Sequence, residues 1–211
     1  KYKVKRDLYV IQSGIDKTRF YKENIDKNEI INLKKDLGLK NTDFIVLYVG
    51  RIAKEKSIDF LINNFNSVLK RIPKAKMIIV GDGPDIKDLI DLSKKEGLEN
   101  KIIFAGKAPW TDVPKYYSLC DVFVTASKTE TQGLTVMEAM GASKPVVAIR
   151  DESFELMITD KKDGLFFDDE KSYVDMIYEV YKNKKLRDEI SVNARRTADK
   201  YSPYNYAKNV L

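Results

Sequence analysis

The chain has 211 residues, of which 43% are hydrophobic and 33% charged, so it is long enough to bury a sizeable core and is expected to be a soluble globular protein. It contains no histidine, which excludes histidine-based catalytic triads, imidazole general bases and histidine metal ligands. Its single cysteine, Cys120, excludes an internal disulfide and favours a cytoplasmic location, while the net charge of +6 suits anionic substrates, nucleic acid or an acidic membrane surface alike.

The first 25 residues are interpreted as a linker and a first strand that lead into the domain. An apolar run at 8–11 predicts the strand, and a turn at 13–16 follows it. The sequence starts at Lys1 without a signal-peptide pattern, and its longest apolar runs are far shorter than a membrane span. We therefore expect a fragment of a longer chain.

Apolar runs and helical periodicity alternate along the rest of the chain. Strands are expected at 44–49, 76–80, 101–105, 121–126, 145–149 and 164–167. Helices are expected at 27–37, 58–71, 85–96, 113–119, 134–140, 170–182 and 184–201, and glycines end several of them, as at Gly38, Gly97 and Gly141. This succession over 1–211 predicts one α/β domain with a doubly wound parallel sheet of about six strands.

The loop after the strand at 44–49 carries two cations. Arg51 and Lys56 follow Gly50 at the carboxyl edge of the predicted sheet, and Ser57 is expected to cap the next helix. The planar fork of arginine and the mobile charge of lysine fit a diphosphate better than a carboxylate. Loop cations are also common as solvated surface groups, so this loop alone leaves both interpretations open.

A glycine-containing turn follows the strand at 76–80 but lacks the pattern of a dinucleotide site. Gly81 and Gly83 are followed directly by Pro84, and the sixth position of the fingerprint is Ile86 rather than glycine. The sequence therefore gives no support for an NAD site.

The segment after the strand at 101–105 adds a third cation and several aromatic residues. Lys107 lies at the carboxyl edge outside any P-loop pattern, so NTP hydrolysis is not expected. Trp110, Tyr116 and Tyr117 fit either stacking on a nucleotide base or packing in the core, and packing is the expected role.

The segment 127–140 joins a buried strand to a short helix and is the most informative stretch of the chain. Gly133 lies at the start of the helix, where free backbone amides and the lack of a Cβ favour an anion such as phosphate. Glu130 precedes the helix and Glu138 lies about one and a half turns into it, so two carboxylates flank the expected anion site. Carboxylates accept hydrogen bonds from hydroxyls, which a nucleotide sugar carries on both sides of its diphosphate. Taken alone, both acids also fit a solvated surface.

Together these motifs resemble the carboxyl-terminal, donor-binding domain of retaining GT-B glycosyltransferases of family 4. The features that carry the resemblance are the Ser-Gly-Ile-Asp turn at 13–16, Gly50-Arg51 with Lys56, the Gly-Asp-Gly-Pro turn at 81–84, and the E-x7-E spacing of Glu130 and Glu138. The resemblance covers nearly all of the chain and implies the Rossmann-type half of a GT-B enzyme. Ser57 stands where a glycine is common in the family, and Gln132 where an aromatic residue is often found.

The resemblance also implies roles for the matching positions. The expected donor-binding residues are Gly50, Arg51, Lys56, Lys107, Gly133, Leu134, Thr135 and Glu138. Arg51 and Lys56 would bind the diphosphate, the amides of 133–135 its oxygens, and Glu138 the ribose hydroxyls. Glu130 would contact the donor sugar and, with Arg51 and Lys56, form the catalytic set of a front-side transfer in which the departing phosphate deprotonates the acceptor. No metal and no cofactor are expected beyond the donor, UDP-glucose or a related nucleotide sugar.

The string at 127–135 is similar to that of diacylglycerol glucosyltransferases, which make bacterial membrane glycolipids. The expected function is transfer of a hexose, glucose first, from a UDP-sugar to a lipid acceptor. The expected partners are the protein's own amino-terminal domain and an anionic membrane surface at the inner face of the cell membrane. Transfer to a polysaccharide or protein acceptor and a non-catalytic nucleotide-sugar module remain alternatives. Nucleic-acid binding is not expected, because the basic residues are not interleaved with aromatic residues.

Overall fold

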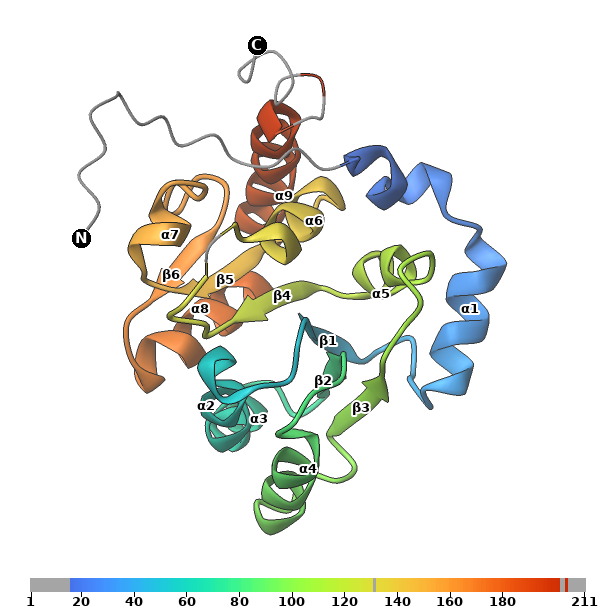
Figure 1. Cartoon of the computed structure of the whole chain (residues 1–211), viewed down its shortest axis with the longest axis vertical. Coiled ribbons are helices and arrows are strands. Elements are labelled where there is room, and N and C mark those ends of the chain that lie inside the picture. The colour runs from blue at the N-terminus through green and yellow to red at the C-terminus, as the bar shows by residue number, and fades with distance from the viewer. Residues whose placement is uncertain (1–15, 131, 202–203, 205–211) are drawn as a thin grey trace, which may run out of the picture.

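The computed structural model describes residues 16–130, 132–201 and 204, and a six-stranded parallel sheet forms their centre (Figure 1). The strands are β1 Phe44–Val49, β2 Ala75–Val80, β3 Ile102–Gly106, β4 Val122–Thr125, β5 Val146–Ile149 and β6 Leu165–Phe167. They pair in the order β3-β2-β1-β4-β5-β6, and each of the five pairings is parallel. The predicted α/β sheet of about six parallel strands is confirmed.

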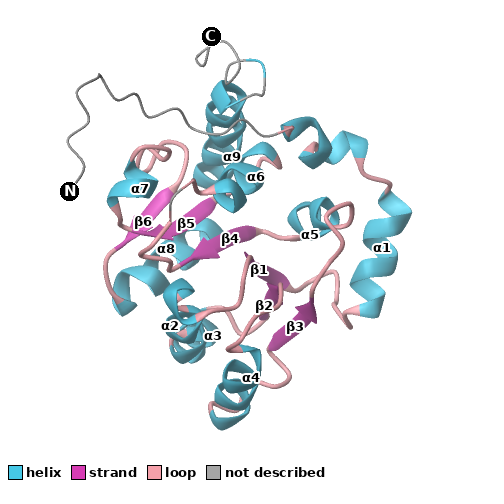
Figure 2. Ribbon diagram, viewed as in Figure 1, coloured by secondary structure: helices cyan, strands magenta, loops and turns pink. Residues whose placement is uncertain are grey.

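Helices cover both faces of the sheet, which makes it doubly wound (Figure 2). One layer consists of α1 Lys27–Asp36, α5 Val113–Leu119, α6 Leu134–Gly141 and α9 Lys184–Ala198. The other consists of α2 Ile58–Asn63, α3 Phe65–Arg71, α4 Ile86–Lys95 and α8 Glu170–Lys182. The short helix α7 Glu152–Glu155 follows β5, and 3-10 turns are formed by η1 Lys17–Phe20, η2 Lys22–Asn24, η3 Lys54–Lys56 and η4 Asp199–Tyr201. Helix α7 was not predicted from the sequence.

The core follows from the apolar runs that predicted the strands. Every residue of β1, β4, β5 and β6 is buried, as expected for strands covered by helices on both faces. Cys120 is buried among these apolar side chains, as expected for a free thiol with a packing role. The strand predicted at 8–11 lies outside the described residues.

The predicted helix at 58–71 is wrong in two respects. It is broken at Asn64, whose side-chain amide donates to the carbonyl of Phe60 at 2.9 Å and so competes with the backbone bonds of a continuous helix. Ser57 also makes no side-chain capping bond, because its backbone is left-handed (φ 49°) and turns the chain out of η3. The residue joins two helical segments without capping either with its hydroxyl.

The predicted end of the helix at Gly141 is also wrong, because α6 includes this residue. A Cβ built on Gly141 would lie 3.4 Å from the Cβ of Lys17, so the glycine serves the close packing of η1 on α6. The left-handed position that ends the helix is taken two residues later by Ser143 (φ 58°).

Ser57→Gly is expected to raise the free energy of unfolding by up to about 1 kcal/mol, because glycine adopts the left-handed region without strain. Urea unfolding measures this change. Ser57→Ala is the control: it keeps the Cβ, removes the hydroxyl, and should change stability by less than about 0.5 kcal/mol. A loss of about 1 kcal/mol in Ser57→Ala would instead indicate a working helix cap.

Candidate functional site

The candidate site lies where the order of the sheet reverses, between the adjacent strands β1 and β4. After β1 the chain continues to β2 on one side, and after β4 it continues to β5 on the other side. The loops that follow β1 and β4 therefore diverge and leave a crevice between them. Open α/β sheets bind ligands in such a crevice. A cavity of about 400 Å³ lies there. Its lining residues are Tyr48, Val49, Gly50, Arg51, Glu55, Lys56, Thr125, Thr129, Glu130, Gln132, Leu134 and Thr135.

Lys56 and Glu130 form an ion pair across this cavity. The ammonium lies 3.0 Å from Oε2 of the carboxylate, and each side chain is only 19% exposed. The other carboxylate oxygen of Glu130 accepts a hydrogen bond from the backbone amide of Gly133 at 3.3 Å. The Glu130 carboxylate therefore contacts the Lys56 ammonium and the Gly133 amide. The sequence analysis predicted that both of these groups would bind a phosphate.

Arg51 lies at the mouth of the same cavity. Its guanidinium is 3.7 Å from the carboxylate of Glu55, and its side chain is 68% exposed, so this pair contributes little to stability. The backbone beneath it is fixed, because the hydroxyl of Tyr48 donates to the Arg51 carbonyl at 3.0 Å. Burial raises the pKa of the Tyr48 phenol, and the nearby carboxylates of Glu130 and Glu55 raise it further, so the hydroxyl remains a donor.

The start of α6 presents its backbone to the cavity beside Leu134 and Thr135. Gly133 precedes the helix in a left-handed conformation (φ 56°), and a Cβ built there would lie 2.2 Å from the terminal methyl of Met157. The packing of Met157 and the backbone turn both favour glycine at this position. Amides at the first turn of α6 have no partner within the helix and are oriented for an anion.

Glu138 lies on the same helix, three residues after the cavity-lining Thr135. Its Oε2 accepts a hydrogen bond from the hydroxyl of Tyr117 on α5 at 2.9 Å. Burial raises the pKa of the Glu138 carboxyl, while the hydrogen bond from Tyr117 and the charge of Arg19 act against the rise. The carboxylate is thus half-buried and held from a neighbouring element.

The turn at 81–84 supports the Arg51 loop from the side of β2. The carbonyl of Asp82 accepts a hydrogen bond from the amide of Ile52 at 2.9 Å. A Cβ on Gly81 would lie 1.9 Å from the carbonyl oxygen of Gly50, and one on Gly83 would lie 2.0 Å from that of Ile52. The two glycines therefore permit close contact between backbones next to the site, a role that the sequence pattern did not reveal.

Comparison with known proteins assigns a family to this arrangement. The Glycosyl transferases group 1 family matches residues 29–197, which include both loops of the cavity. The chain belongs to the group 1 glycosyl transferases. It is 37% identical over 206 residues to an Alpha-monoglucosyldiacylglycerol synthase of Acholeplasma laidlawii, a match that covers 96% of this chain and 51% of that protein. A protein of the same name from Streptococcus pneumoniae is 32% identical over 179 residues, which are 85% of this chain and 41% of that protein.

The solved structure of another protein has the same fold as this glycosyl transferase chain. The crystal structure of Anabaena Alr3699/HepE in complex with UDP and glucose aligns with a TM-score of 0.85, over 96% of this chain and 55% of that chain, at 23% identity. The fold is thus that of one Rossmann-like half of a GT-B glycosyltransferase. The chain spans about half the length of the curated relatives it matches.

Most of the predicted site residues of the glycosyl transferase chain come together. Gly50, Arg51, Lys56, Glu130, Leu134 and Thr135 line the cavity. Gly133 directly precedes α6, and Glu138 lies on α6 three residues after Thr135. Lys107 is exposed at the end of β3, an edge strand of the sheet, and is not among the lining residues. Lys107 therefore stays a prediction that the cavity does not support.

The aromatic residues of the 106–117 segment divide into two groups. Tyr116 and Tyr117 are buried, as predicted. The packing predicted for Trp110 is wrong: the side chain is 66% exposed, and the guanidinium of Arg19 lies over its ring at 3.1 Å from the centroid. This cation–π contact joins η1 to the loop before α5.

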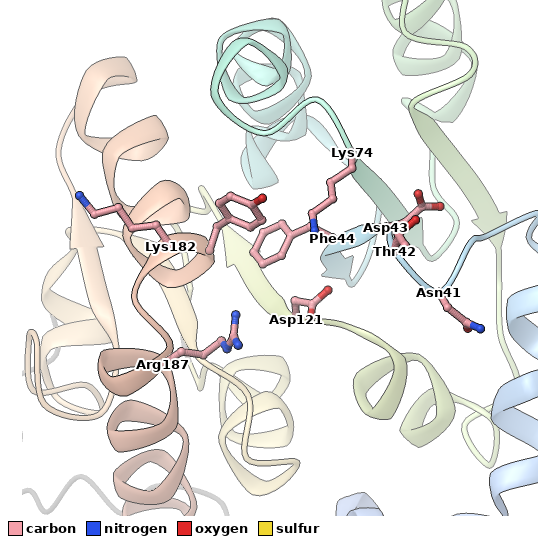
Figure 3. Close-up of a pocket in the computed structure, with 9 residues that line it drawn as sticks. Asn41, Thr42, Asp43, Phe44, Lys74, Asp121, Lys182 and Arg187 are labelled. Atoms are coloured by element: carbon pink, nitrogen blue, oxygen red, sulfur yellow. The ribbon is translucent and has the colours of Figure 1, made fainter.

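A second cavity of about 510 Å³ lies at the opposite, amino-terminal edge of the sheet (Figure 3). Its walls come from the start of β1, the loop before β2 and the turn between α8 and α9. Lys74, Lys182 and Arg187 line it together with Asp43 and Asp121, so its charge is mixed. None of the predicted donor-binding residues lies among its lining residues, so a substitution in this cavity is a control for substitutions in the first one.

Across the described residues, no three or more carboxylate or thiol groups lie close enough together to hold a metal ion. Among the helices of that same part of the chain, none combines the length and the apolar character needed to cross a bilayer.

Proposed function

We propose that the chain is the donor-binding half of a retaining glycosyltransferase that moves a hexose, glucose first, from a UDP-sugar to a lipid acceptor such as diacylglycerol. The observation that carries this proposal is the convergence of Arg51, Lys56, Glu130 and the start of α6 on one cavity, with Glu138 further along α6. The names of the two relatives support a glucosyl donor and a diacylglycerol acceptor, and the neighbouring structure with UDP and glucose supports the nucleotide.

In the proposed complex the diphosphate lies against Lys56 and the first amides of α6, with Arg51 closing over it from the exposed side. An ammonium has three donors, so Lys56 can contact a phosphate oxygen and keep Glu130 as a neighbour. Glu138 accepts the ribose hydroxyls and Glu130 the hydroxyls of the sugar. These positions put one acid on each side of the diphosphate.

The proposed transfer is front-side. The acceptor hydroxyl attacks the anomeric carbon while the glycosidic bond to the diphosphate breaks, and the departing phosphate takes the proton from that hydroxyl. Negative charge accumulates on the leaving phosphate, where Lys56, Arg51 and the helix start stabilise it. These cations and amides can balance the leaving group without a metal ion.

The complete protein is proposed to include an amino-terminal half that binds the acceptor, and to work at the inner face of the cell membrane against an anionic surface. The greater length of the relatives supports a second half, and their lipid products support the location. An assay of the complete protein with diacylglycerol and with soluble saccharide acceptors distinguishes a lipid glycosyltransferase from one that extends a polysaccharide.

Arg51→Ala and Glu138→Ala are each expected to weaken UDP binding by about tenfold or more, because each removes a charge-assisted hydrogen bond to the ligand. Calorimetric titration of the chain with UDP measures the dissociation constants. Arg187→Ala is the matched control, since this arginine lines the second cavity at the opposite edge of the sheet. UDP affinity that falls in Arg187→Ala and is unchanged in the other two variants would place the nucleotide in the second cavity and contradict the proposal.

A further inference from the structure

Tyr117 connects α5 to two residues of the proposed donor site. Its side chain is fully buried, and its hydroxyl lies 2.9 Å from Oε2 of Glu138 and 3.1 Å from the carbonyl oxygen of Thr135. The ring is fixed by edge contact with Phe20 at 5.6 Å and by a tilted contact with Phe123 at 5.8 Å between centroids. A rigid aromatic ring thus places one polar atom beside the carboxylate.

We propose that Tyr117 is a positioning residue: its hydroxyl fixes the carboxylate of Glu138 in the orientation that receives the ribose hydroxyls of the nucleotide. This inference rests on the proposed function. The phenol has one proton, and the charged carboxylate is a stronger acceptor than the carbonyl of Thr135. The hydrogen bond therefore goes mainly to Glu138.

The remaining oxygen of Glu138 is the one that the geometry leaves to the ligand. Oε2 is committed to Tyr117, while Oε1 has no hydrogen-bond partner among the residues that the structure describes. A glutamate side chain has three rotatable bonds, and without the tyrosine it would have to lose that freedom when the nucleotide binds. Tyr117 removes part of this cost before binding.

The surroundings keep Tyr117 as the donor and Glu138 as the acceptor. Burial raises the pKa of the Tyr117 phenol well above its usual range, and the Glu138 carboxylate raises it further, so the hydroxyl keeps its proton. Other elements also pack against α6. The 3-10 turn η1 contributes Arg19, whose charge lowers the pKa of the Glu138 carboxyl, and Lys17, which is paired with Asp199. Helix α9 buries only apolar side chains.

Tyr117→Phe removes the hydroxyl and keeps the ring contacts, so the fold should be retained and the melting temperature checks this. At neutral pH the dissociation constant for UDP is expected to rise about tenfold, whereas that for inorganic pyrophosphate, which has no ribose, should not change. Affinity for UDP falls in wild type as acidification protonates Glu138. The variant loses a hydrogen bond that lowers this pKa, so its loss of affinity should occur at higher pH.

A second probe separates positioning from general damage. Wild type should bind UDP more tightly than 2′,3′-dideoxyuridine diphosphate, and Tyr117→Phe should lose most of that preference. A variant that keeps the wild-type UDP affinity, pH profile and preference would overturn the inference alone. A wild-type chain that binds no UDP would overturn the proposed function and this inference together.

Discussion

Lys56→Ala is expected to lower the rate of sugar transfer by the complete protein by at least about 100-fold, the usual cost of removing one preorganised group from a site of developing charge. The ammonium lines the cavity on the short turn η3, with its side chain only 19% exposed. Arg51 cannot take over this role, because its side chain is 68% exposed and extends at the mouth of the cavity. A screened, mobile cation stabilises the leaving phosphate less than a half-buried one.

The same change is expected to weaken UDP binding for a second reason. Without Lys56 the carboxylate of Glu130 loses the ammonium that lies 3.0 Å from its Oε2, so more of its negative charge acts on the diphosphate. The double variant Lys56→Ala/Glu130→Gln should therefore bind UDP more tightly than Lys56→Ala, although it transfers no sugar. Lys56→Arg should restore only part of the activity, because the guanidinium is larger than the ammonium it replaces and the Lys56 side chain is only 19% exposed, beside Glu130.

Transfer rates and UDP titrations of these variants, measured side by side, test the argument. Lys185→Ala is the control for the loss of a lysine, because this residue is 87% exposed at the start of α9 and should leave both quantities unchanged. If Lys56→Ala kept the wild-type rate, the leaving phosphate would have to be stabilised elsewhere. If Glu130→Gln did not improve UDP binding in the Lys56→Ala background, charge repulsion would not explain the weaker affinity.

The sequence could predict which residues share the site but not how they pair. Lys56 and Glu130 both follow parallel strands, and the carboxyl ends of such strands meet at one edge of the sheet. Their ion pair depends on the turn of η3 and on the side-chain directions of two loops, which no periodicity encodes. Gly133 was predicted to offer its amide to a phosphate, and in the structure this amide bonds Glu130.

The role of the Tyr117 hydroxyl could not be predicted from the sequence, for a different reason. An aromatic residue in a short helix is expected to pack in the core, and Tyr117 does so. Its hydroxyl meets Glu138 only because β4 returns the chain beside α5 before α6 begins, a tertiary contact across 21 positions. A phenylalanine would satisfy the same apolar pattern, so the only signal in the sequence was the choice of tyrosine at a core position.

The sequence around Gly81 and Gly83 lacks the glycine pattern of a dinucleotide site, which argues against NAD binding but indicates no other role for the pair. The structure gives the pair a positive role, since both lie against the backbone of the loop after β1. Close approach of two backbones depends on register between neighbouring strands, and spacing within one turn does not specify it.

Gly83→Ala is expected to lower the free energy of unfolding by about 3 kcal/mol, the upper end of the usual cost of overpacking. The φ angle at Gly83 is not in the left-handed region, so strain in the turn itself is not the cause. The added Cβ would lie 2.0 Å from the carbonyl oxygen of Ile52, and that oxygen belongs to a buried backbone that cannot rotate away as a side chain could. The loop after β1 or the turn after β2 must therefore move.

Gly97→Ala provides the control for this clash. Gly97 has a left-handed φ of 66° but nothing within 4 Å of an added Cβ, so alanine there should cost only the backbone strain of about 1 kcal/mol. Urea unfolding of both variants measures the two effects separately: Gly83→Ala introduces a steric clash without backbone strain, and Gly97→Ala introduces backbone strain without a clash. Equal losses of stability in the two variants would contradict the assigned role of Gly83.

Movement of the loop after β1 would also displace Arg51 in the proposed donor site. Ile52 directly follows Arg51, and its amide is bonded to the carbonyl of Asp82, so displacing one turn displaces the other. Gly83→Ala should therefore weaken UDP binding even at temperatures where the variant is fully folded, whereas Gly97→Ala should not. Since a shift of about 1 Å in a positioning group can cost about 100-fold in catalysis, the transfer rate of the complete protein should fall further than the affinity for UDP.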